Sequence, residues 1–134
     1  LTVGSPIPIA GGEREATYGG FQRYIVEGGV DWIQADPGRC GISLMVEVGR
    51  MAARHRVGFV NHSFKTGISI AASLHVLAAV PRGNLLEYAM TDSPLRHELT
   101  HEKFEVVEGM VSVPDGPGLG ITVDETTVEK YACP

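Results

Sequence analysis

Residues 57–62 read Val-Gly-Phe-Val-Asn-His, a short apolar run that ends in a histidine. Runs of this length, rich in β-branched and aromatic residues and bounded by glycine or proline, are typical of buried strands. Three further apolar runs also lead to a polar residue. They are residues 6–10 leading through two glycines to Glu13, residues 30–35 leading to Asp36, and residues 85–86 leading to Glu87. We therefore predict four strands, each followed by a polar side chain.

Apolar residues recur at helical spacing between these predicted strands. The three sets are Phe21, Tyr24 and Ile25; Ile42, Met45, Val46, Gly49 and Ala53; and Ile70, Leu74, Leu77 and Ala78. Strands that alternate with helices form parallel sheets, because each helix returns the chain to the start of the next strand. From Glu13, the polar strand ends follow one another at intervals of 23, 26 and 25 residues. That period is typical of successive units of a (β/α) barrel.

The sequence thus predicts an α/β fold of about four βα units, which is half of a TIM barrel, in residues 1–90. Four parallel strands leave two open edges, so we expect further strands to be missing. Residues 91–134 do not continue the pattern. They are expected to form a tail with a hairpin around Glu108-Gly109 (residues 104–113), a loop at residues 114–120 and a short helix capped by Asp124.

Composition excludes several classes of function. The chain has 11 Lys and Arg against 16 Asp and Glu and no basic run, which disfavours a nucleic-acid partner. Its two cysteines show no CxxC spacing, so a reducing, cytoplasmic setting is expected. The longest apolar stretch, residues 68–80, is too short to span a bilayer, and no signal peptide is recognisable. We therefore expect a soluble cytoplasmic protein with no membrane association.

The polar strand ends are the candidate functional residues, because the chemistry of parallel barrels lies at the carboxyl ends of the strands. Glu13 follows two glycines and can reach a hard cation such as Mg²⁺, although a lone glutamate is more often a solvated loop residue. Asp36 beside His62 would orient the imidazole and raise its basicity. Taken separately, Asp36 also suits a helix cap and His62 a buried core histidine. Glu87 suits either a hydrogen bond to substrate or an ordinary ion pair.

The chain resembles the C-terminal half of the enolase superfamily, in particular the mandelate racemase subgroup of the mandelate racemase/muconate lactonizing enzyme family. The matching stretches cover essentially the whole chain in the family's order. They are residues 7–13 (IPIAGGE), 34–36 (QAD) with 39–43 (RCGIS), 60–62 (VNH), 73–75 (SLH) with 78–79, 86–87 (LE) and 113–120 (VPDGPGLG). The resemblance implies the C-terminal portion of a modified TIM barrel, with residues 91–134 packing on the barrel or on a capping domain.

The resemblance also implies a role for each strand end. Glu13 would be the third carboxylate ligand of a Mg²⁺ ion, in a site that is incomplete in this chain. Asp36 and His62 would form the general base that abstracts the proton α to a substrate carboxylate, and Glu87 would contact that carboxylate. Apart from the resemblance, Phe64 and Lys65 follow His62 on the same loop and are candidates to face the substrate, although Lys65 fits a solvated loop equally well. Arg39 occupies the position of a catalytic lysine in other branches of the superfamily; because arginine stays charged, it favours the Asp-His base, and a structural ion pair is expected for it.

The expected function is therefore Mg²⁺-assisted dehydration of a small carboxylate substrate, a sugar acid. A racemase or epimerase of the same subgroup is the nearest alternative, and an inactive half-barrel acting as an assembly module is a second. A barrel family with the same strand-end layout by convergence is a third, disfavoured by the glycine-rich stretches. The resemblance places a capping domain, two further metal ligands and lysine motifs in a missing N-terminal part of the enzyme. We expect the chain alone to be inactive and the complete enzyme to be a homo-oligomer.

Overall fold

The computed structural model describes residues 2–133 and contains a small parallel sheet. Strands β1 (Ala10–Gly11), β2 (Trp32–Ala35) and β3 (Gly58–Asn61) lie side by side in chain order. Strands β2 and β3 pair in parallel over their whole length. Helix α1 (Tyr18–Val26) joins the first two strands and helix α2 (Pro37–Arg54) joins the second and third. The predicted alternation and the α/β class are confirmed.

The first predicted strand is wrong in its position. Residues 6–10 were expected to pair, but only Ala10 and Gly11 join β2, after a single 3₁₀ turn at Thr2–Gly4 and an irregular segment. Pro6 and Pro8 have no backbone N–H to donate to a ladder, which keeps the preceding residues out of the sheet. Ile7 is accordingly exposed rather than buried.

The fourth predicted strand is reduced to one bridge. Leu85 pairs in parallel with Val60 of β3, and no regular strand continues from it within residues 2–133. The Asn61 side chain instead bonds the next part of this segment: its Oδ1 accepts the Glu87 amide at 2.8 Å, and its Nδ2 donates to the Glu87 carbonyl at 3.1 Å. A buried side-chain amide therefore holds the segment in place of backbone pairing.

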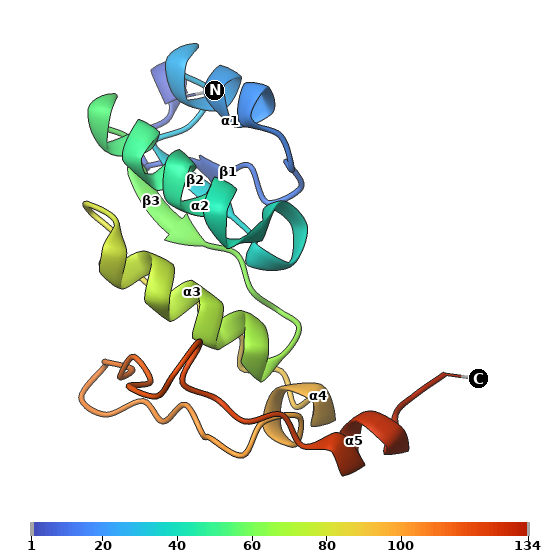
Figure 1. Cartoon of the computed structure of the whole chain (residues 1–134). Coiled ribbons are helices and arrows are strands. Elements are labelled where there is room, and N and C mark those ends of the chain that lie inside the picture. Colours follow the sequence, from blue (N-terminus) through green and yellow to red (C-terminus); the bar gives the residue numbers. More distant parts are fainter. Residues whose placement is uncertain (1, 134) are drawn as a thin grey trace.

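The core lies between one face of the sheet and the helices. The three helices that pack on the core each begin at a side-chain cap: Thr17 accepts the Gly20 amide before α1, Asp36 accepts the Gly38 amide before α2, and Thr66 accepts the Ser69 amide before α3 (Gly67–Ala79). The largest fully buried apolar side chains are Phe21, Phe59, Ile33, Met45, Val48 and Val76. Figure 1 shows α3 between the sheet with its two helices and the C-terminal tail.

Two glycines of α2 are needed for different reasons, one for a close contact and one for its backbone conformation. A Cβ on Gly49 of α2 would lie 2.9 Å from the Val80 side chain at the end of α3, so this glycine lets the two helices approach. Gly41 has φ 74° and ψ 162°, which breaks α2 after its first turn. The turn that follows Asp36 is therefore a separate unit from the longer part of α2 that packs on the core.

The described part of the tail, residues 91–133, has little regular structure. It contains the short helices α4 (Pro94–His97) and α5 (Glu125–Lys130), and α5 is capped by Asp124 as predicted. The predicted hairpin is reduced to one bridge between Val107 and Met110 around Glu108-Gly109, both of which have positive φ as a type I′ turn requires. Within residues 2–133 the flanking residues do not pair further.

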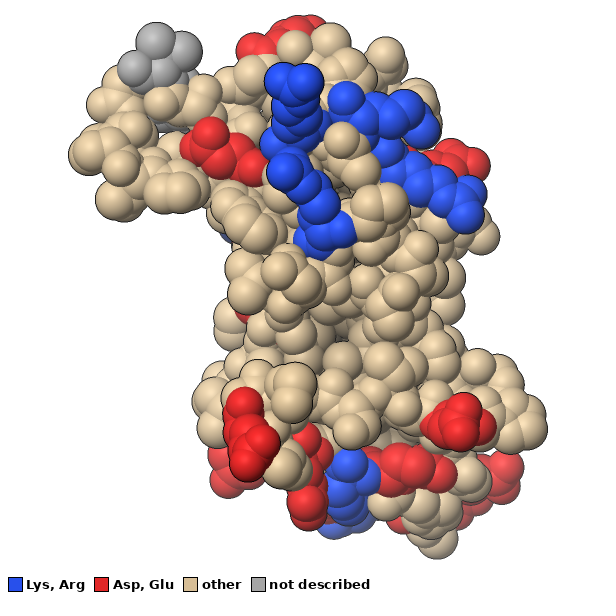
Figure 2. Space-filling model, turned by 90° about the vertical axis from the view of Figure 1, so that its left-hand side faces the viewer, with Lys and Arg blue, Asp and Glu red and all other residues tan. Residues whose placement is uncertain are grey.

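Charge also separates the two regions. Residues 1–90 carry eight Lys and Arg against seven Asp and Glu, whereas the tail carries three against nine. Figure 2 shows basic side chains gathered on the upper part of the molecule and acidic ones on the lower part. No helix within residues 2–133 combines the length and the apolar character needed to cross a membrane.

Candidate functional site

The polar strand ends predicted from the sequence meet at one edge of the sheet. Glu13 follows β1, Asp36 follows β2 and His62 follows β3, and Glu87 lies just after the bridge at Leu85. His62 contacts both Glu13 and Asp36, while Glu87 accepts a hydrogen bond from Gln34 of β2. Parallel strands in register bring residues that are far apart in sequence to the same edge.

The central contact of this cluster joins Asp36 and His62. The His62 Nδ1 atom lies 3.1 Å from Asp36 Oδ2, and the His62 backbone amide donates to the Ala35 carbonyl at 2.9 Å. The Asp36 side chain is 1% exposed and that of His62 is 15% exposed. Asp36 is both a helix cap and the partner of His62, the two roles considered for it from the sequence. Its Oδ1 accepts the Gly38 amide at 2.7 Å and so caps α2, and its Oδ2 faces the imidazole.

Several donors surround the Asp36 carboxylate. Besides His62 and the Gly38 amide, Lys65 Nζ lies 3.3 Å from Oδ2, and Arg39 Nε lies 4.0 Å from the same oxygen. Burial on its own would raise the pKa of Asp36, but the hydrogen bonds from His62, the Gly38 amide and Lys65 outweigh it and hold that pKa below its usual range. The carboxylate therefore stays ionised at neutral pH.

This environment determines which imidazole nitrogen is available for chemistry. An ionised Asp36 accepts a hydrogen bond from Nδ1–H, so in the neutral imidazole Nε2 carries the lone pair. The Nε2 atom lies 3.4 Å from Glu13 Oε2. Glu13 is in turn 3.6 Å from Arg14 Nε, and its side chain is 44% exposed. Its carboxylate thus reaches both the imidazole and solvent.

The donor set for a divalent cation is partial. Glu13 offers an accessible carboxylate at the strand edge, which is the ligand chemistry that Mg²⁺ takes. Within the described part of the chain, no group of three or more His, Cys, Asp or Glu side chains is placed to hold a metal ion. The residues present therefore fit one ligand of a Mg²⁺ site and not a whole one.

Glu87 is held by residues whose roles were missed in the sequence. Gln34 Nε2 donates to Glu87 Oε2 at 2.9 Å, and the fully buried Asn61 fixes the Glu87 backbone through two hydrogen bonds. Gln34 lies two residues before Asp36, and Asn61 lies directly before His62. Their places beside these predicted site residues are the feature of the sequence from which a role could have been predicted for them. Glu87 makes no ion pair among the contacts of residues 2–133.

Phe64 and Lys65 both contact the Asp36–His62 pair. The Phe64 ring lies 5.2 Å from the His62 ring, centroid to centroid, and is 54% exposed. Lys65 is not simply solvated, because its ammonium bonds Asp36 while almost half of its side chain remains exposed. The ion pair expected for Arg39 is present as the 4.0 Å contact with Asp36. The loop after β3 thus places an aromatic ring and a cation beside the pair.

The chain is similar to known proteins over almost its whole length. The enolase C-terminal domain-like family matches residues 1–127. The D-galactarolactone cycloisomerase of Agrobacterium fabrum (strain C58) is 35% identical over all of the chain and 38% of its own length. The arabinonate dehydratase of Saccharolobus solfataricus is 34% identical over 95% of the chain and 34% of its own length.

A solved structure has the same fold. The 3,6-anhydro-D-galactonate cycloisomerase of Zobellia galactanivorans superposes with a TM-score of 0.88 at 33% sequence identity. The match covers 97% of this chain and 37% of that protein. The chain therefore spans little more than a third of the length of these similar proteins.

Proposed function

Because the chain belongs to the enolase C-terminal domain-like family, we propose that it forms the C-terminal part of the catalytic barrel of an acid-sugar dehydratase. The family, the partial-barrel fold and the similar dehydratases and cycloisomerases agree with the resemblance read from the sequence. The observation that carries the proposal is the 3.1 Å contact between His62 and Asp36 at neighbouring strand ends. The reaction class is abstraction of the proton α to a substrate carboxylate.

His62 acts as the general base in this proposal. Its Nε2 lone pair accepts the proton, while Asp36 holds Nδ1–H and stabilises the imidazolium that forms. Glu13, 3.4 Å from Nε2, adds a second negative charge beside the protonated ring. After abstraction, the proton can return to carbon or assist departure of a β-hydroxyl group, and the second course is dehydration.

Glu87, Phe64 and Lys65 contact the substrate in this proposal. Glu87 contacts the substrate carboxylate as charge develops on it, and the Gln34 hydrogen bond orients the Glu87 side chain for that contact. Phe64 covers the His62 ring and reduces its contact with water. Lys65, anchored on Asp36, presents its remaining donors to substrate oxygens.

Glu13 would hold the Mg²⁺ ion together with ligands from outside residues 2–133. The cation would supply positive charge that stabilises the enediolate form of the substrate carboxylate. Its affinity depends on several oxygen ligands acting together, so a single carboxylate holds it weakly. The chain's own part is to keep the Glu13 carboxylate accessible at the strand edge.

The proposal also covers how this chain fits into the complete enzyme. Residues 1–90 are the C-terminal half of the barrel and residues 91–134 are a tail that packs on the barrel or capping domain. An N-terminal part supplies the remaining strands, metal ligands and acid or base groups, and the complete enzyme is a homo-oligomer. The coverage of about 34–38% of similar proteins supports a longer enzyme of this kind.

Cycloisomerisation is the second candidate, because two of the similar proteins are cycloisomerases. Both activities belong to the same family, and racemisation or epimerisation would use the same base. The products differ, however. Dehydration removes one water from the acid sugar, whereas an isomerase leaves its mass unchanged.

The test is to assay the complete protein that carries residues 1–134 against a set of acid sugars with Mg²⁺ present. Mass spectrometry would detect loss of water, and polarimetry or NMR would detect an isomer of unchanged mass. We expect His62→Asn to lower kcat by about 10²- to 10⁴-fold, because it removes a general base. Circular dichroism would show that the variant is folded.

The matched control is His101→Asn in the exposed tail, which should leave turnover unchanged. Full turnover by the His62→Asn protein would contradict the base assignment. A biological effect that survives this substitution would instead favour a non-catalytic assembly module. Residues 1–134 alone should show no turnover, and activity of the purified chain with Mg²⁺ would refute that expectation.

A further inference from the structure

Two of the turns that connect a helix to the next strand hold arginine where glycine is favoured. Arg56 lies between α2 and β3, and Arg82 lies between α3 and the bridge at Leu85. Their φ angles are 61° and 64°, in the left-handed region that side chains disfavour and glycine adopts at little cost. Glu108 is the one other non-glycine residue with positive φ within residues 2–133. The backbone of both turns would therefore be less strained with glycine.

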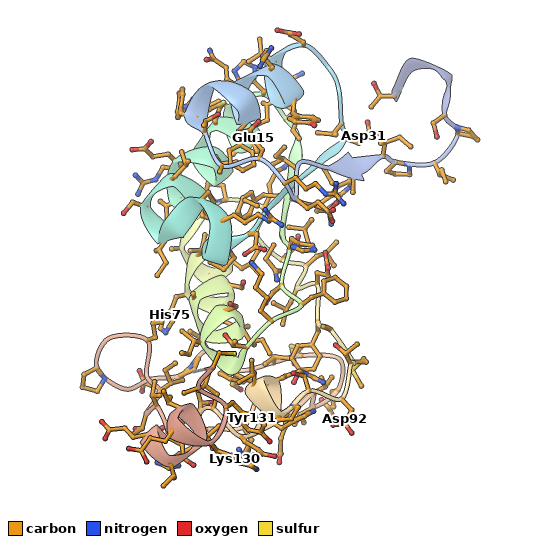
Figure 3. All side chains as sticks on the ribbon, turned by 90° about the vertical axis from the view of Figure 1, so that its right-hand side faces the viewer. Glu15, Asp31, His75, Asp92, Lys130 and Tyr131 are labelled. Carbon is orange, nitrogen blue, oxygen red and sulfur yellow. The ribbon has the colours of Figure 1, made fainter. Side chains whose placement is uncertain are left out.

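Both arginines line the same pocket. It has a volume of about 330 Å³, and its other lining residues are Asp31, Trp32, Gly58 and Asn84. Asp31, labelled in Figure 3, directly precedes β2, while Arg56 precedes β3 and Arg82 precedes the bridge at Leu85. The polar residues of the candidate site follow these same strands. The pocket and the candidate site therefore lie at opposite ends of the sheet.

The positive charge of the two arginines has no counter-charge in the pocket. Neither Arg56 nor Arg82 forms an ion pair within residues 2–133. Arg82 Nη1 donates to the Arg56 carbonyl at 3.0 Å, which holds the two turns together. Asp31 is the one carboxylate among the lining residues, and its Oδ2 accepts the Ile9 amide at 2.8 Å. A guanidinium has five N–H donors, so both arginines, which are exposed, keep donors for a ligand.

We propose that this pocket binds the phosphate group of a small metabolite. A phosphate has three terminal oxygens and up to about two negative charges, so it can accept hydrogen bonds from two guanidiniums at once. A carboxylate has two oxygens, and a single guanidinium occupies both. Trp32 supplies an aromatic wall for the rest of the ligand, because its ring lies against Gly58, where a Cβ would collide with it. The pocket volume is within the range of small-molecule sites.

The test is calorimetric titration of the complete protein that carries residues 1–134, without Mg²⁺, so that phosphate cannot bind a metal ion at the candidate site. Inorganic phosphate and glycerol 3-phosphate should both bind, and the tighter of the two identifies the source of the phosphate group. Succinate is a dianion without phosphate and should bind about tenfold more weakly or not at all. Failure of both phosphates to bind, or an equal affinity for succinate, would overturn the proposal.

Glycine variants separate ligand binding from a structural role. Arg56→Gly and Arg82→Gly should each weaken phosphate binding about tenfold or more, because each removes a charged hydrogen-bond donor. Their Tm should stay the same or rise, because glycine relaxes the turn. Glu108→Gly is the matched control, whose Tm should respond in the same way while phosphate affinity is unchanged. Arg50→Gln, which removes an exposed cation of α2 outside this pocket, should also leave the affinity unchanged.

Unchanged phosphate affinity in the two glycine variants would mean that the arginines only fasten the turns together, and would overturn the proposal whatever the Tm. If Arg82→Gly does not fold, Arg82→Gln replaces it, because this change removes the charge and retains a side-chain amide for the Arg56 carbonyl. Its phosphate affinity then decides in the same way. The acid-sugar reaction enters none of these measurements, so the phosphate site can fail while the proposed function stands, and the reverse.

Discussion

Residues 2–90, called the barrel section here because they hold the parallel sheet, and residues 91–133, called the tail, are organised by different forces. The barrel section holds the parallel sheet, the longer helices and all but a few of the buried side chains. The tail has two short helices and isolated bridges, and its buried residues are Leu99, Thr100 and Thr127. The candidate site is therefore positioned by a packed sheet edge, whereas the tail is held by individual contacts.

Those individual contacts connect the tail to α3 and to the segment after Leu85. His75 of α3, labelled in Figure 3, has its Nε2 3.1 Å from the Leu119 carbonyl in the glycine-rich loop. The Tyr88 hydroxyl bonds the Phe104 carbonyl, and the Arg96 guanidinium lies 4.7 Å from the Tyr88 ring centroid. Lys130 and Glu98 form an exposed ion pair within the tail itself.

The largest expected contrast is between an apolar side chain of the barrel section and one of the tail. Phe59→Ala should lower the free energy of unfolding by about 3–5 kcal/mol, because Phe59 is fully buried against the helices and truncation leaves a cavity. Met110→Ala in the tail should change it by less than about 0.5 kcal/mol, since Met110 is 68% exposed. Urea unfolding of both variants measures the difference. Similar costs would show that the tail is as tightly packed as the core.

An intermediate effect is expected from a carboxylate of the barrel section. Asp36→Asn should cost about 2 kcal/mol at neutral pH through the loss of charge-assisted hydrogen bonds. The pKa of Asp36 is lowered in the folded state, so its stabilisation is complete above the pKa of an unfolded aspartate, about 3.9. It is lost as pH falls through the lower folded-state pKa.

The difference in free energy of unfolding between the Asp36→Asn variant and the original chain should therefore shrink as pH falls below about 4. Denaturant titrations at a series of pH values measure this convergence. Glu105→Gln, at an exposed carboxylate of the tail, serves as the control. Its free energy of unfolding should change with pH in the same way as that of the original chain. A constant gap between Asp36→Asn and the original chain at all pH values would refute the ion-pairing account of Asp36.

The smallest expected effect concerns the contact between the two regions. His75→Leu removes the hydrogen bond to the Leu119 carbonyl and should cost about 1 kcal/mol. Hydrogen exchange should accelerate at the amides of residues 116–120 and stay unchanged in β2 and β3. His101→Leu, at an exposed histidine of the tail, should alter neither region. Faster exchange in the sheet would show that the tail and the barrel section unfold together.

The sequence predicted the parts of the fold that depend on local pattern. Alternation of short apolar runs with helical periodicity indicated parallel strands, and the regular spacing of Glu13, Asp36 and His62 indicated that they share one edge. Asp124 was recognisable as a helix cap because aspartate is favoured at that position, and its carboxylate does bond the amides two and three residues ahead. The strand at residues 6–10 was wrong, although Pro6 and Pro8 already argued against it.

Only the tertiary structure decided which side chains meet. Lys65 bonds Asp36 across 29 residues, Gln34 bonds Glu87 across 53, and His75 reaches Leu119 across 44. Such pairs depend on where separate segments pack and on the rotamer each long side chain adopts there, and neither leaves a periodic signal in the sequence. Periodicity determined the strand edge on which the candidate base lies, and packing determined the cations and amides that surround it.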